Sequence, residues 1–425
     1  MKQLRLNQIE KQENTVIYHY SVSEELKHFF SSRLFIIEYP LSLETVPDAV
    51  LAVPFVANVL PIVWLTDSEL VIPELDKAFY DCIPNVKAGY ETMFPESSFL
   101  GKVTVGNVVP CENPSKDRCA LFYSGGVDSM QTLISHVEEH PILLSVWGSD
   151  IRYDNQDGWN VMHKAIEEAA SHYHLDEYVI RSTFREFDDE GALDRQFSAQ
   201  LKDGWWHGAK HGLALLGHVA PIAWLLGLNR MYIASSHCPQ DGHVRCASNP
   251  LTDDHVRFAN CQVCHDGFAF SRQDKIKNIV QYNKGKVTVL PLHVCWETQT
   301  GSNCSKCEKC YRTMCAIAAE NTDCSVYGFE KLESDKHFHY NLVHALIGKN
   351  EVSTSYWTHI KKRIIDNEDL LKKQPYWAKL RLLKKIDFAH PEKLKMPFYW
   401  RVRTKLPQMR WYRALSKVKH YIIDR

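Results

Sequence analysis

A short segment at residues 124–129 has the composition of a phosphate-binding loop. It reads Ser-Gly-Gly-Val-Asp-Ser and follows an apolar run at residues 119–123. The two glycines let backbone N–H groups crowd around an anion. A helical pattern that begins at about Ser129 would add the partial positive charge of a helix N-terminus. The hydroxyl of Ser124 and the carboxylate of Asp128, which could hold Mg²⁺, complete a predicted cradle for a polyphosphate. The cradle differs from the Walker form, because the Gly-Lys-Ser/Thr ending is missing.

Four cysteines near residue 300 have the spacing of a zinc site. They follow the pattern C-x8-C-x2-C-x2-C, in which the short steps let neighbouring thiolates turn onto one ion. Four thiolates around Zn²⁺ form a closed structural site with no open position for catalysis. We expect Zn²⁺ here rather than free thiols, because the cysteines are clustered in a chain with no export signal. Residues 303–306 suit a tight turn whose N–H groups could bond the sulfurs. The four ligands are Cys295, Cys304, Cys307 and Cys310.

Further cysteines and histidines lie between residues 237 and 265, without a regular spacing. Buried thiols that pack as small apolar groups explain this pattern best. A second metal site in this region stays open as the alternative. The preceding segment Trp205-Trp206-His207 is predicted to cap the pocket, or to belong to a core cluster. The irregular set comprises His237, Cys238, His243, Cys246, Cys261, Cys264 and His265.

The elements that would position these residues alternate between short apolar runs and amphipathic helical patterns. This alternation predicts an α/β fold with a doubly wound, Rossmann-like parallel sheet covered on both faces. Ligands of such sheets bind beyond the carboxyl ends of the strands, where residues 124–129, 147–150 and 235–237 would lie. The predicted strands are 119–123, 142–146, 178–182, 231–235 and 287–292, and the predicted helices are 129–139, 159–172, 213–226 and 272–283.

The sequence divides into three parts by composition. Residues 1–112 read as an N-terminal α/β extension, with strands at 34–39 and 62–65 and a helix at 73–83 that has proline in its first turn. Turn-forming residues at 109–117 suggest a linker. The predicted parts are 1–112, a central domain at 113–320 that carries the loop and the cysteines, and a mostly helical, basic extension at 321–425.

Composition and charge place few limits on function. The chain has 425 residues, of which 45% are hydrophobic, and this proportion is ordinary for a globular protein. The N-terminus lacks the apolar core of a signal sequence, which predicts a cytoplasmic protein. The longest apolar stretch, residues 49–65, contains two prolines and is too short and too broken for a predicted membrane span.

The net charge of −1 hides a basic C-terminal segment. Residues 356–425 contain 19 Lys/Arg and 6 Asp/Glu. Tryptophans at 357, 377, 400 and 411 alternate with basic clusters such as 361–363 and 401–403. This pattern fits contact with a nucleic acid or with an anionic membrane surface. It fits a docking surface for an acidic protein, or a solvated helical face, equally well.

The 124–129 loop resembles the signature of the PP-loop ATP pyrophosphatases, which cleave ATP between the α and β phosphates. Their fold is of the adenine nucleotide alpha hydrolase type. The resemblance implies that ATP and Mg²⁺ bind at the loop and that AMP is transferred to a substrate oxygen. The residues carried over to the pyrophosphate and Mg²⁺ site are Ser124, Gly125, Gly126, Val127, Asp128 and Ser129.

The cysteine pattern narrows the resemblance. A PP-loop followed about 165 residues later by C-x8-C-x2-C-x2-C is similar to the 7-cyano-7-deazaguanine synthases, over roughly residues 119–320. That family activates a deazaguanine carboxylate with ATP and accepts ammonia. Arg272 and Arg312 fall where the family has basic residues, and either could meet phosphate as a charge-assisted donor. The resemblance implies catalytic roles for Asp128, Ser124 and Arg272.

Two departures concern the substrate side. The family's Gly-Gln-Arg-His stretch is replaced by residues 147–152, and its Arg-Asn pair is replaced by residues 210–212. Relatives with extensions like 1–112 and 321–425 occur in bacterial anti-phage operons, and the resemblance implies that they join a deazaguanine to a protein partner. The implied function is adenylation of a small-molecule carboxylate, with capture by ammonia or a protein amine.

Three other functions fit the same sequence. A tRNA-modifying PP-loop enzyme would give the basic segment a role. A catalytically degenerate loop could bind nucleotide as a scaffold for a partner or for a membrane-associated complex. A similar amidation could serve surface-glycan synthesis. Each of these alternatives keeps nucleotide binding at residues 124–129 and differs in what the nucleotide is used for.

Overall fold

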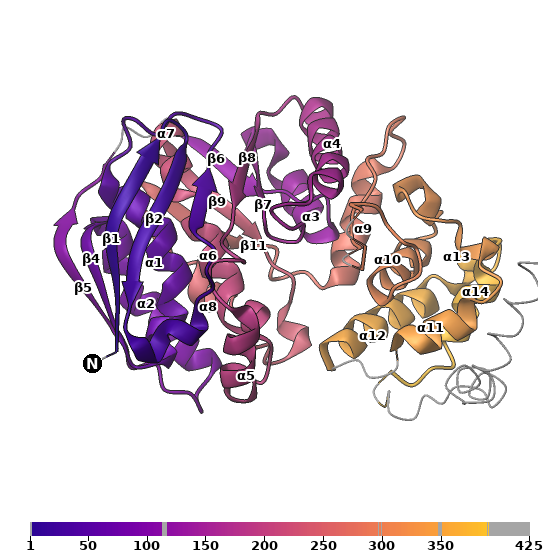
Figure 1. Cartoon of the computed structure of the whole chain (residues 1–425). Coiled ribbons are helices and arrows are strands. Elements are labelled where there is room, and N and C mark those ends of the chain that lie inside the picture. Colours follow the sequence, from indigo (N-terminus) through magenta and orange to yellow (C-terminus); the bar gives the residue numbers. More distant parts are fainter. Residues whose placement is uncertain are drawn as a thin grey trace, which may run out of the picture. The chain divides into compact units, whose positions relative to one another are not determined.

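The computed structural model describes most of the chain as two compact units, Met1–Asn303 and Cys304–Arg425 (Figure 1). Each unit is described by itself below. The described residues are 2–112, 117–295, 297–298, 300–346, 351–388 and 390.

The first unit is built on one sheet, which in the described residues has eleven strands in the order β10-β11-β9-β6-β7-β8-β3-β2-β1-β4-β5. Strands β11, β9, β6, β7 and β8 run parallel, as do β1, β4 and β5, and antiparallel pairs connect β8, β3, β2 and β1. The predicted α/β class is confirmed, with a sheet that is mostly parallel. The strands are β1 Gln3–Gln12, β2 Thr15–Val22, β3 Phe35–Glu38, β4 Glu69–Asp76, β5 Lys102–Val109, β6 Arg118–Phe122, β7 Ile142–Trp147, β8 Glu177–Ser182, β9 Leu228–Ala234, β10 Arg257–Phe258 and β11 Cys261–Asp266.

Helices connect these strands and cover the sheet. The predicted helices at 129–139, 159–172 and 272–283 correspond to α3, α4 and α9, while the predicted helix at 213–226 is divided into α6 and α7. The helices of this unit are α1 Asp48–Leu65, α2 Lys77–Met93, α3 Val127–His136, α4 Gln156–Tyr173, α5 Glu190–Leu201, α6 His211–Gly217, α7 Ala220–Leu226, α8 Pro250–Asp253 and α9 Arg272–Asn283, with a π-helical turn at Trp206–Lys210 and 3₁₀ turns at Glu24–Phe29, Val137–Glu139 and Pro239–Asp241.

The strand order reverses its direction at β6. From β6 the chain moves to β7 and then to β8 on one side, whereas β9 and β11 lie on the other side of β6. The loops after β6 and β9 therefore leave the sheet in opposite directions. In open parallel sheets, ligands bind at such a switch point.

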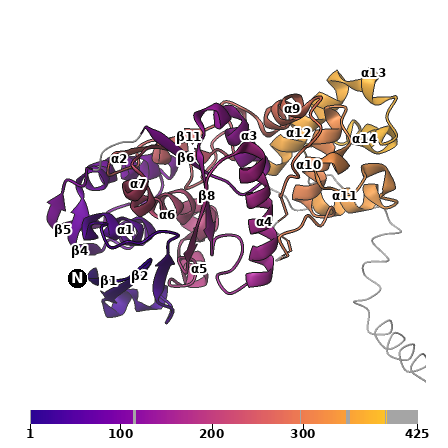
Figure 2. The same ribbon diagram turned by 90° about the horizontal axis from the view of Figure 1, so that it is seen from above.

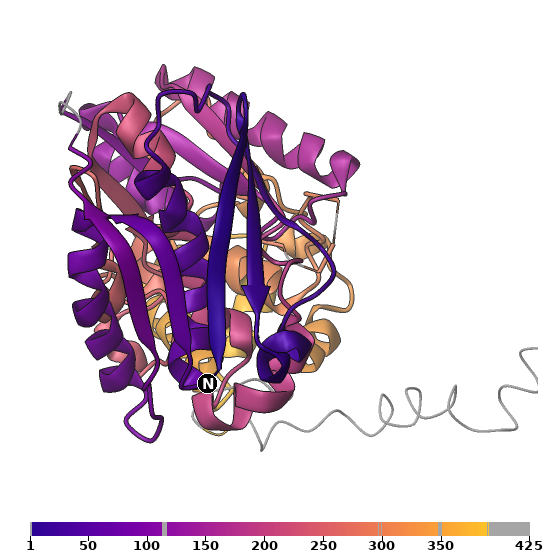
Figure 3. The same cartoon turned by 60° about the vertical axis from the view of Figure 1, so that its left-hand side comes forward.

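The N-terminal strands belong to the same sheet as the predicted central domain. Strand β3 pairs with β8, with Ile37 opposite Ser182. The hydroxyl of Thr183 accepts from the backbone N–H of Ile36 at 2.8 Å. Figure 3 shows the indigo strands β1 and β2 lying side by side in this part of the sheet. The sequence division at residue 112 thus marks a loop, and the spatial division falls at residue 303.

Helix α1 replaces the strand predicted at 62–65. Residues 49–64 are all buried, so the apolar character has no helical or strand periodicity that could distinguish the two. The side chain of Asn58 donates to the carbonyl of Pro54 at 2.8 Å inside the helix. Length and composition would allow α1 to cross a membrane, and 89% of it is buried in the structure.

Helix α1 lies directly on α6, as Figures 1 and 2 show. Gly217 makes the close approach possible, because a Cβ added there would stand 2.4 Å from the Cβ of Ala57. This packing places α1 in the core of the first unit, together with α7 and β4.

The helix predicted at 73–83 begins at Lys77, four residues later than predicted. Pro73 lies in β4, opposite Gly106 of β5, and the helix α2 begins at Lys77. The carboxylate of Asp76 accepts from the N–H of Phe79 at 3.1 Å, which caps the helix. The proline therefore precedes the helix rather than opening it.

The strand predicted at 287–292 is also wrong. Those residues have no regular secondary structure, and β11 takes the position beside β9. Strand β11 reads Cys-Gln-Val-Cys-His-Asp, which is too polar to stand out as a buried strand. The other four predicted strands correspond to β6, β7, β8 and β9.

The second unit is helical in its described part. Helix α10 packs on α11, α12 and α14. Trp357 is fully buried, donates its Nε1–H to Glu308 at 2.8 Å and stacks on Phe388 with ring centroids 5.8 Å apart. The elements are α10 Glu308–Ala319, α11 Phe338–Leu346, α12 Glu351–Asp366, α13 Glu368–Leu371 and α14 Trp377–Leu383, with 3₁₀ turns at Cys324–Tyr327 and Leu332–Ser334.

Candidate functional site

The 124–129 loop lies at the carboxyl end of β6, as the sequence predicts. It leaves the carboxyl end of β6 and continues directly into α3, for which Gly126 is the N-cap residue. Gly125 has a φ of +68°, a left-handed conformation that residues with a side chain adopt at a cost. This turn directs the chain from strand to helix, and the N–H groups of the first helical turn open toward the loop.

The two serines of the loop have different positions. Ser124 is exposed, whereas Ser129 is buried. The hydroxyl of Ser129 accepts from the N–H of Ser124 at 3.3 Å and donates to the carbonyl of Gly126 at 3.2 Å. Ser129 thus holds the shape of the loop, and Ser124 is the hydroxyl that a ligand could reach. Val127, predicted as a binding residue, is 1% exposed and anchors the loop in the core.

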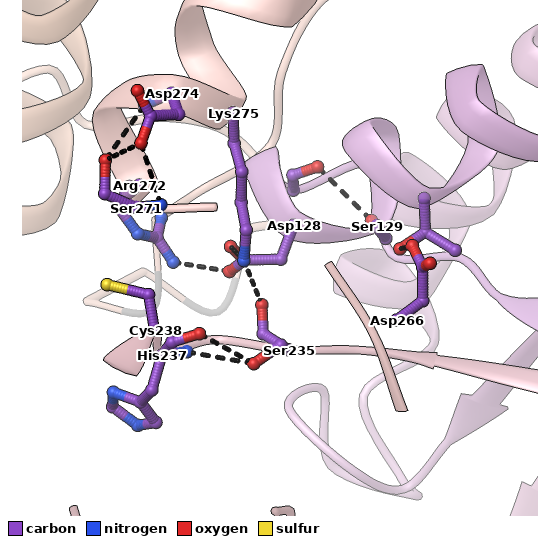
Figure 4. Close-up of polar contacts among 12 residues, drawn as sticks. Asp128, Ser129, Ser235, His237, Cys238, Asp266, Ser271, Arg272, Asp274 and Lys275 are labelled. Atoms are coloured by element: carbon purple, nitrogen blue, oxygen red, sulfur yellow. Dashed lines mark hydrogen bonds and ion pairs between the residues drawn. The ribbon is translucent and has the colours of Figure 1, made fainter. Parts of the chain in front are cut away.

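Asp128 forms ion pairs with two cations of α9. Its carboxylate lies 2.5 Å from the guanidinium of Arg272 and 3.1 Å from the ammonium of Lys275 (Figure 4). Both cations are at least 92% buried. The structure therefore brings Asp128 and Arg272 together as predicted and adds Lys275, which the sequence analysis missed. Helical spacing could have indicated Lys275, because a residue three positions after Arg272 lies on the same face of a helix.

Helix α9 is held in place by its own cap. Ser271 and Asp274 form a capping box, in which the Ser271 hydroxyl accepts from the N–H of Asp274 at 3.2 Å and the Asp274 carboxylate accepts from the N–H of Ser271 at 3.1 Å. Helices α3 and α9 pack together. Two helix N-termini, each with a partial positive charge, therefore begin beside the same carboxylate.

The loop after β9 completes this side of the site. Lys275 also donates to the carbonyl of Ser235, the first residue after β9. The hydroxyl of Ser235 in turn donates to the carbonyl of His237 at 2.8 Å. Lys275 thus connects the loop after β9 to the loop after β6, at the switch point where a ligand is expected.

His293 covers the 124–129 loop, which no sequence pattern had indicated. The backbone N–H of His293 donates to the carbonyl of Gly125 at 2.8 Å. A Cβ added at Gly125 would stand 3.1 Å from the His293 ring. The ring Nδ1 donates to the carbonyl of Gly301 at 3.2 Å, and burial lowers the pKa of His293. A neutral imidazole therefore lies against the glycine of the turn.

Trp147 and Lys210, at the positions where the sequence departs from the resembled motifs, contact other residues of the fold. The ring of Trp147 stacks on the ring of Trp159, with centroids 5.2 Å apart. The guanidinium of Arg181 lies over the Trp147 ring, 4.1 Å from its centroid. Lys210 is fully buried and forms an ion pair with Asp188 at 2.6 Å. The residues at 147 and 210 therefore carry packing and ion-pair contacts within the fold.

The four predicted zinc ligands are assembled. One ligand atom from each of Cys295, Cys304, Cys307 and Cys310 lies within 4.8 Å of the others. The sulfur of Cys304 accepts from the N–H groups of Lys306 at 3.4 Å and Cys307 at 3.2 Å, so the predicted turn is confirmed. This four-cysteine cluster could hold a metal such as zinc, for which thiolates with N–H···S bonds are typical ligands.

Arg312 and the cysteines outside the four-cysteine cluster have different surroundings. Arg312 lies 3.7 Å from Glu308 and its guanidinium lies over the ring of Tyr356 at 4.4 Å. Cys238, Cys261 and Cys264 join no metal-type cluster within the described residues. Cys246, in contrast, lies with His207 and His237. Of these three residues, His237 and Cys246 belong to the irregular set in the sequence, whereas His207 belongs to the segment predicted to form a pocket cap or a core cluster.

Comparison of the chain with protein-family models, with curated proteins and with solved structures gave no match. The switch point of the sheet at β6 is the place that combines a glycine turn, two helix N-termini and two buried cations.

Proposed function

We propose that the protein activates a carboxylate on a small heterocycle, such as a 7-deazaguanine acid, by transferring AMP to it from ATP. The observation that carries this proposal is the contact of Arg272 and Lys275 with Asp128 of the 124–129 loop, at the switch point of the sheet. A glycine turn with N–H groups, flanked by cations, suits a polyphosphate that must leave as pyrophosphate.

The reaction needs one bond exchange at the α phosphorus. A carboxylate oxygen of the substrate forms a bond to that phosphorus, the bond to the bridging oxygen breaks, and its electron pair leaves with pyrophosphate. Arg272 and Lys275 would stabilise the charge that develops on the leaving group, and Ser124 would donate to it. These groups act by position and charge, so no covalent enzyme intermediate is required.

Asp128 is the residue that fits a Mg²⁺ ligand. Its carboxylate is of the preferred ligand type, and its side chain is 15% exposed. The ion would neutralise part of the phosphate charge. Arg272 and Lys275 orient this carboxylate.

The acyl-adenylate would then react with an amine. The nitrogen attacks the carbonyl carbon, AMP leaves with the electron pair of the C–O bond, and the nitrogen loses a proton to solvent. Ammonia and the amino group of a protein are the two acceptors that we propose. The resemblance to the extended anti-phage relatives supports a protein acceptor and a role in anti-phage defence.

Product analysis tests the proposal. The protein is incubated with ATP, Mg²⁺ and a 7-deazaguanine acid, with ammonium or with co-expressed neighbouring proteins. Chromatography and mass spectrometry should find AMP and pyrophosphate together with an amide product, and the Asp128→Asn variant should give neither. Formation of ADP and phosphate, or equal AMP formation by the variant, would contradict it.

The basic segment 356–425 supports a second proposal, contact with an anionic partner such as a nucleic acid or a membrane surface. In its described part, several cations are used within the unit: Arg363 pairs with Glu320 at 2.7 Å and Lys384 with Glu368 at 2.5 Å. The cluster at 401–403 and the tryptophans at 400 and 411 lie outside the described residues. Salt-sensitive retention of tRNA that disappears when 391–425 is removed would favour a tRNA-modifying enzyme.

A further inference from the structure

Three side chains that the proposed reaction does not use converge near the loop after β9. One ligand atom from each of His207, His237 and Cys246 lies within 4.8 Å of the other two. The rings of His207 and His237 meet edge to face, with centroids 5.7 Å apart. Cys246 is 2% exposed. We refer to these three residues as the His–Cys group.

The fold, and not local sequence, assembles the His–Cys group. His207 lies in the π-helical turn before α6, and such turns are frequent at functional sites. His237 follows β9 at the carboxyl edge of the sheet, and Cys246 lies in the segment between β9 and α8. In Figure 4 the ring of His237 points away from Arg272 and Lys275. The group is therefore separate from the phosphate-binding contacts.

A carboxylate orients one of the imidazoles. Nδ1 of His207 lies 2.5 Å from the carboxylate of Asp203, four residues earlier. This contact leaves Nε2 as the ring atom of His207 that can face the sulfur. Histidines that bind metals characteristically donate their other ring N–H to a carboxylate, which fixes the tautomer and the ring orientation.

The sulfur of Cys246 lies beside two imidazole rings. One ring nitrogen each of His207 and His237 lies within 4.8 Å of it. Because a buried thiol normally packs among apolar groups, two imidazoles beside a single buried sulfur need another explanation. Imidazole nitrogen and thiolate sulfur are the ligands that zinc and related divalent ions prefer.

We propose that His207, His237 and Cys246 bind a divalent transition-metal ion of the zinc class, in addition to the four-cysteine cluster. Three protein ligands leave a fourth position for water or for a substrate atom, which is the arrangement of catalytic and ligand-binding zinc sites. The proposal concerns metal binding and does not depend on ATP chemistry at the 124–129 loop.

The competing interpretation is a nucleophilic cysteine, with Cys246, His207 and Asp203 as a triad. A nucleophile needs one base and an open approach to its sulfur. Cys246 has ring nitrogens of two histidines within 4.8 Å of its sulfur and is almost completely buried, so the arrangement favours a metal.

Metal analysis of the full-length protein tests the proposal. The protein is loaded with excess Zn²⁺, passed over a desalting column and measured by inductively coupled plasma mass spectrometry. We expect about two zinc ions per chain, and about one in Cys246→Ser and His237→Ala, since each site holds one ion. His243→Ala is the matched control: His243 belongs to the same segment but contacts the carbonyl of Met93, and this variant should keep both ions.

Cobalt gives a second readout that does not depend on stoichiometry alone. Co²⁺ bound through one thiolate should add a charge-transfer band that is absent from Cys246→Ser and retained in His243→Ala. If Cys246→Ser fails to fold by circular dichroism, His207→Gln replaces it. One zinc per metal-replete wild-type chain, or two ions retained in both the Cys246→Ser and His237→Ala proteins, would overturn the proposal. Rapid alkylation of Cys246 by iodoacetamide that is unaffected by Zn²⁺ would overturn it in favour of the triad.

Discussion

Asp128 in the first turn of α3 is bonded to Arg272, the first residue of α9, across 144 residues of sequence. The guanidinium and carboxylate atoms lie 2.5 Å apart. This contact fixes the N-termini of two helices beside one loop. A site that must hold a departing pyrophosphate needs this combination of N–H donors and cations in a fixed arrangement.

Replacing Asp128 should abolish adenylation. Asp128→Asn keeps the shape of the side chain but removes the charge that orients Arg272 and Lys275 and that could hold Mg²⁺. We expect AMP formation to fall by about 100-fold or more. The rate of AMP formation, measured by chromatography, checks this. Asp81→Asn, which changes an exposed carboxylate on α2, is the control and should retain full turnover.

Replacing Lys275 should affect stability as well as nucleotide use. The Lys275 side chain is 2% exposed and contacts both Asp128 and the carbonyl of Ser235. Lys275→Met removes a buried charge from its partners, and we expect a loss of about 3 kcal/mol in the free energy of unfolding. Urea denaturation measures this value.

The second effect of Lys275→Met should be a KM for ATP raised by about 10-fold, as expected when one charge-assisted contact of about 1.4 kcal/mol is lost. Lys277→Met, on the same helix but outside the contacts of Asp128, is the matched control. If both variants have the same KM and the same stability as the wild type, Lys275 has no part in the site.

The four-cysteine cluster should account for one metal ion and for part of the stability of the chain. Cys307 is both a cluster member and the N-cap of α10. Cys307→Ser should therefore lose about one zinc ion relative to the wild type and melt at a lower temperature. Cys315→Ser, on the same helix but outside the cluster, should retain the metal. Equal zinc content in the two variants would exclude the cluster as a zinc site.

His218 should make the protein less stable in acid. Burial lowers the pKa of His218 to about 4. Its Nδ1 donates to the carbonyl of Ala214 at 2.6 Å, and its Nε2 accepts from the hydroxyl of Ser182 at 2.9 Å. Below the pKa of an unfolded histidine, about 6.5, the unfolded chain binds the proton and the folded chain does not. Stability should thus be present above pH 6.5 and decrease as the pH falls toward 4.

Urea denaturation at pH 7 and at pH 5 measures this effect. The wild type should lose about 2 kcal/mol more than His218→Gln between these two pH values, since one proton separates the two states over most of that range. Parallel pH profiles for the two proteins would show that His218 is not the group that titrates.

Local patterns in the sequence were sufficient for the loop and for the four cysteines. Residues 124–129 and the ligands of the four-cysteine cluster are each close together in sequence, so spacing alone groups them. Lys275, His293 and the His–Cys group depend on which loops the sheet topology brings together, and spacing carries no such information. The sequence predicts a strand at 62–65, the end of α1, because α1 is apolar on every side, and it gives no signal for β11 because β11 is polar.

Binding of a non-hydrolysable nucleotide tests the central claim most directly, since it needs neither the acid nor the amine. In isothermal calorimetry with α,β-methylene-ATP and Mg²⁺, the wild type should bind one nucleotide per chain. Gly125→Val should bind at least about 10-fold more weakly, because Gly125 has a φ of +68° and a Cβ there would stand 3.1 Å from the His293 ring. No binding by the wild type, or equal affinity in the two proteins, would contradict a phosphate site at residues 124–129.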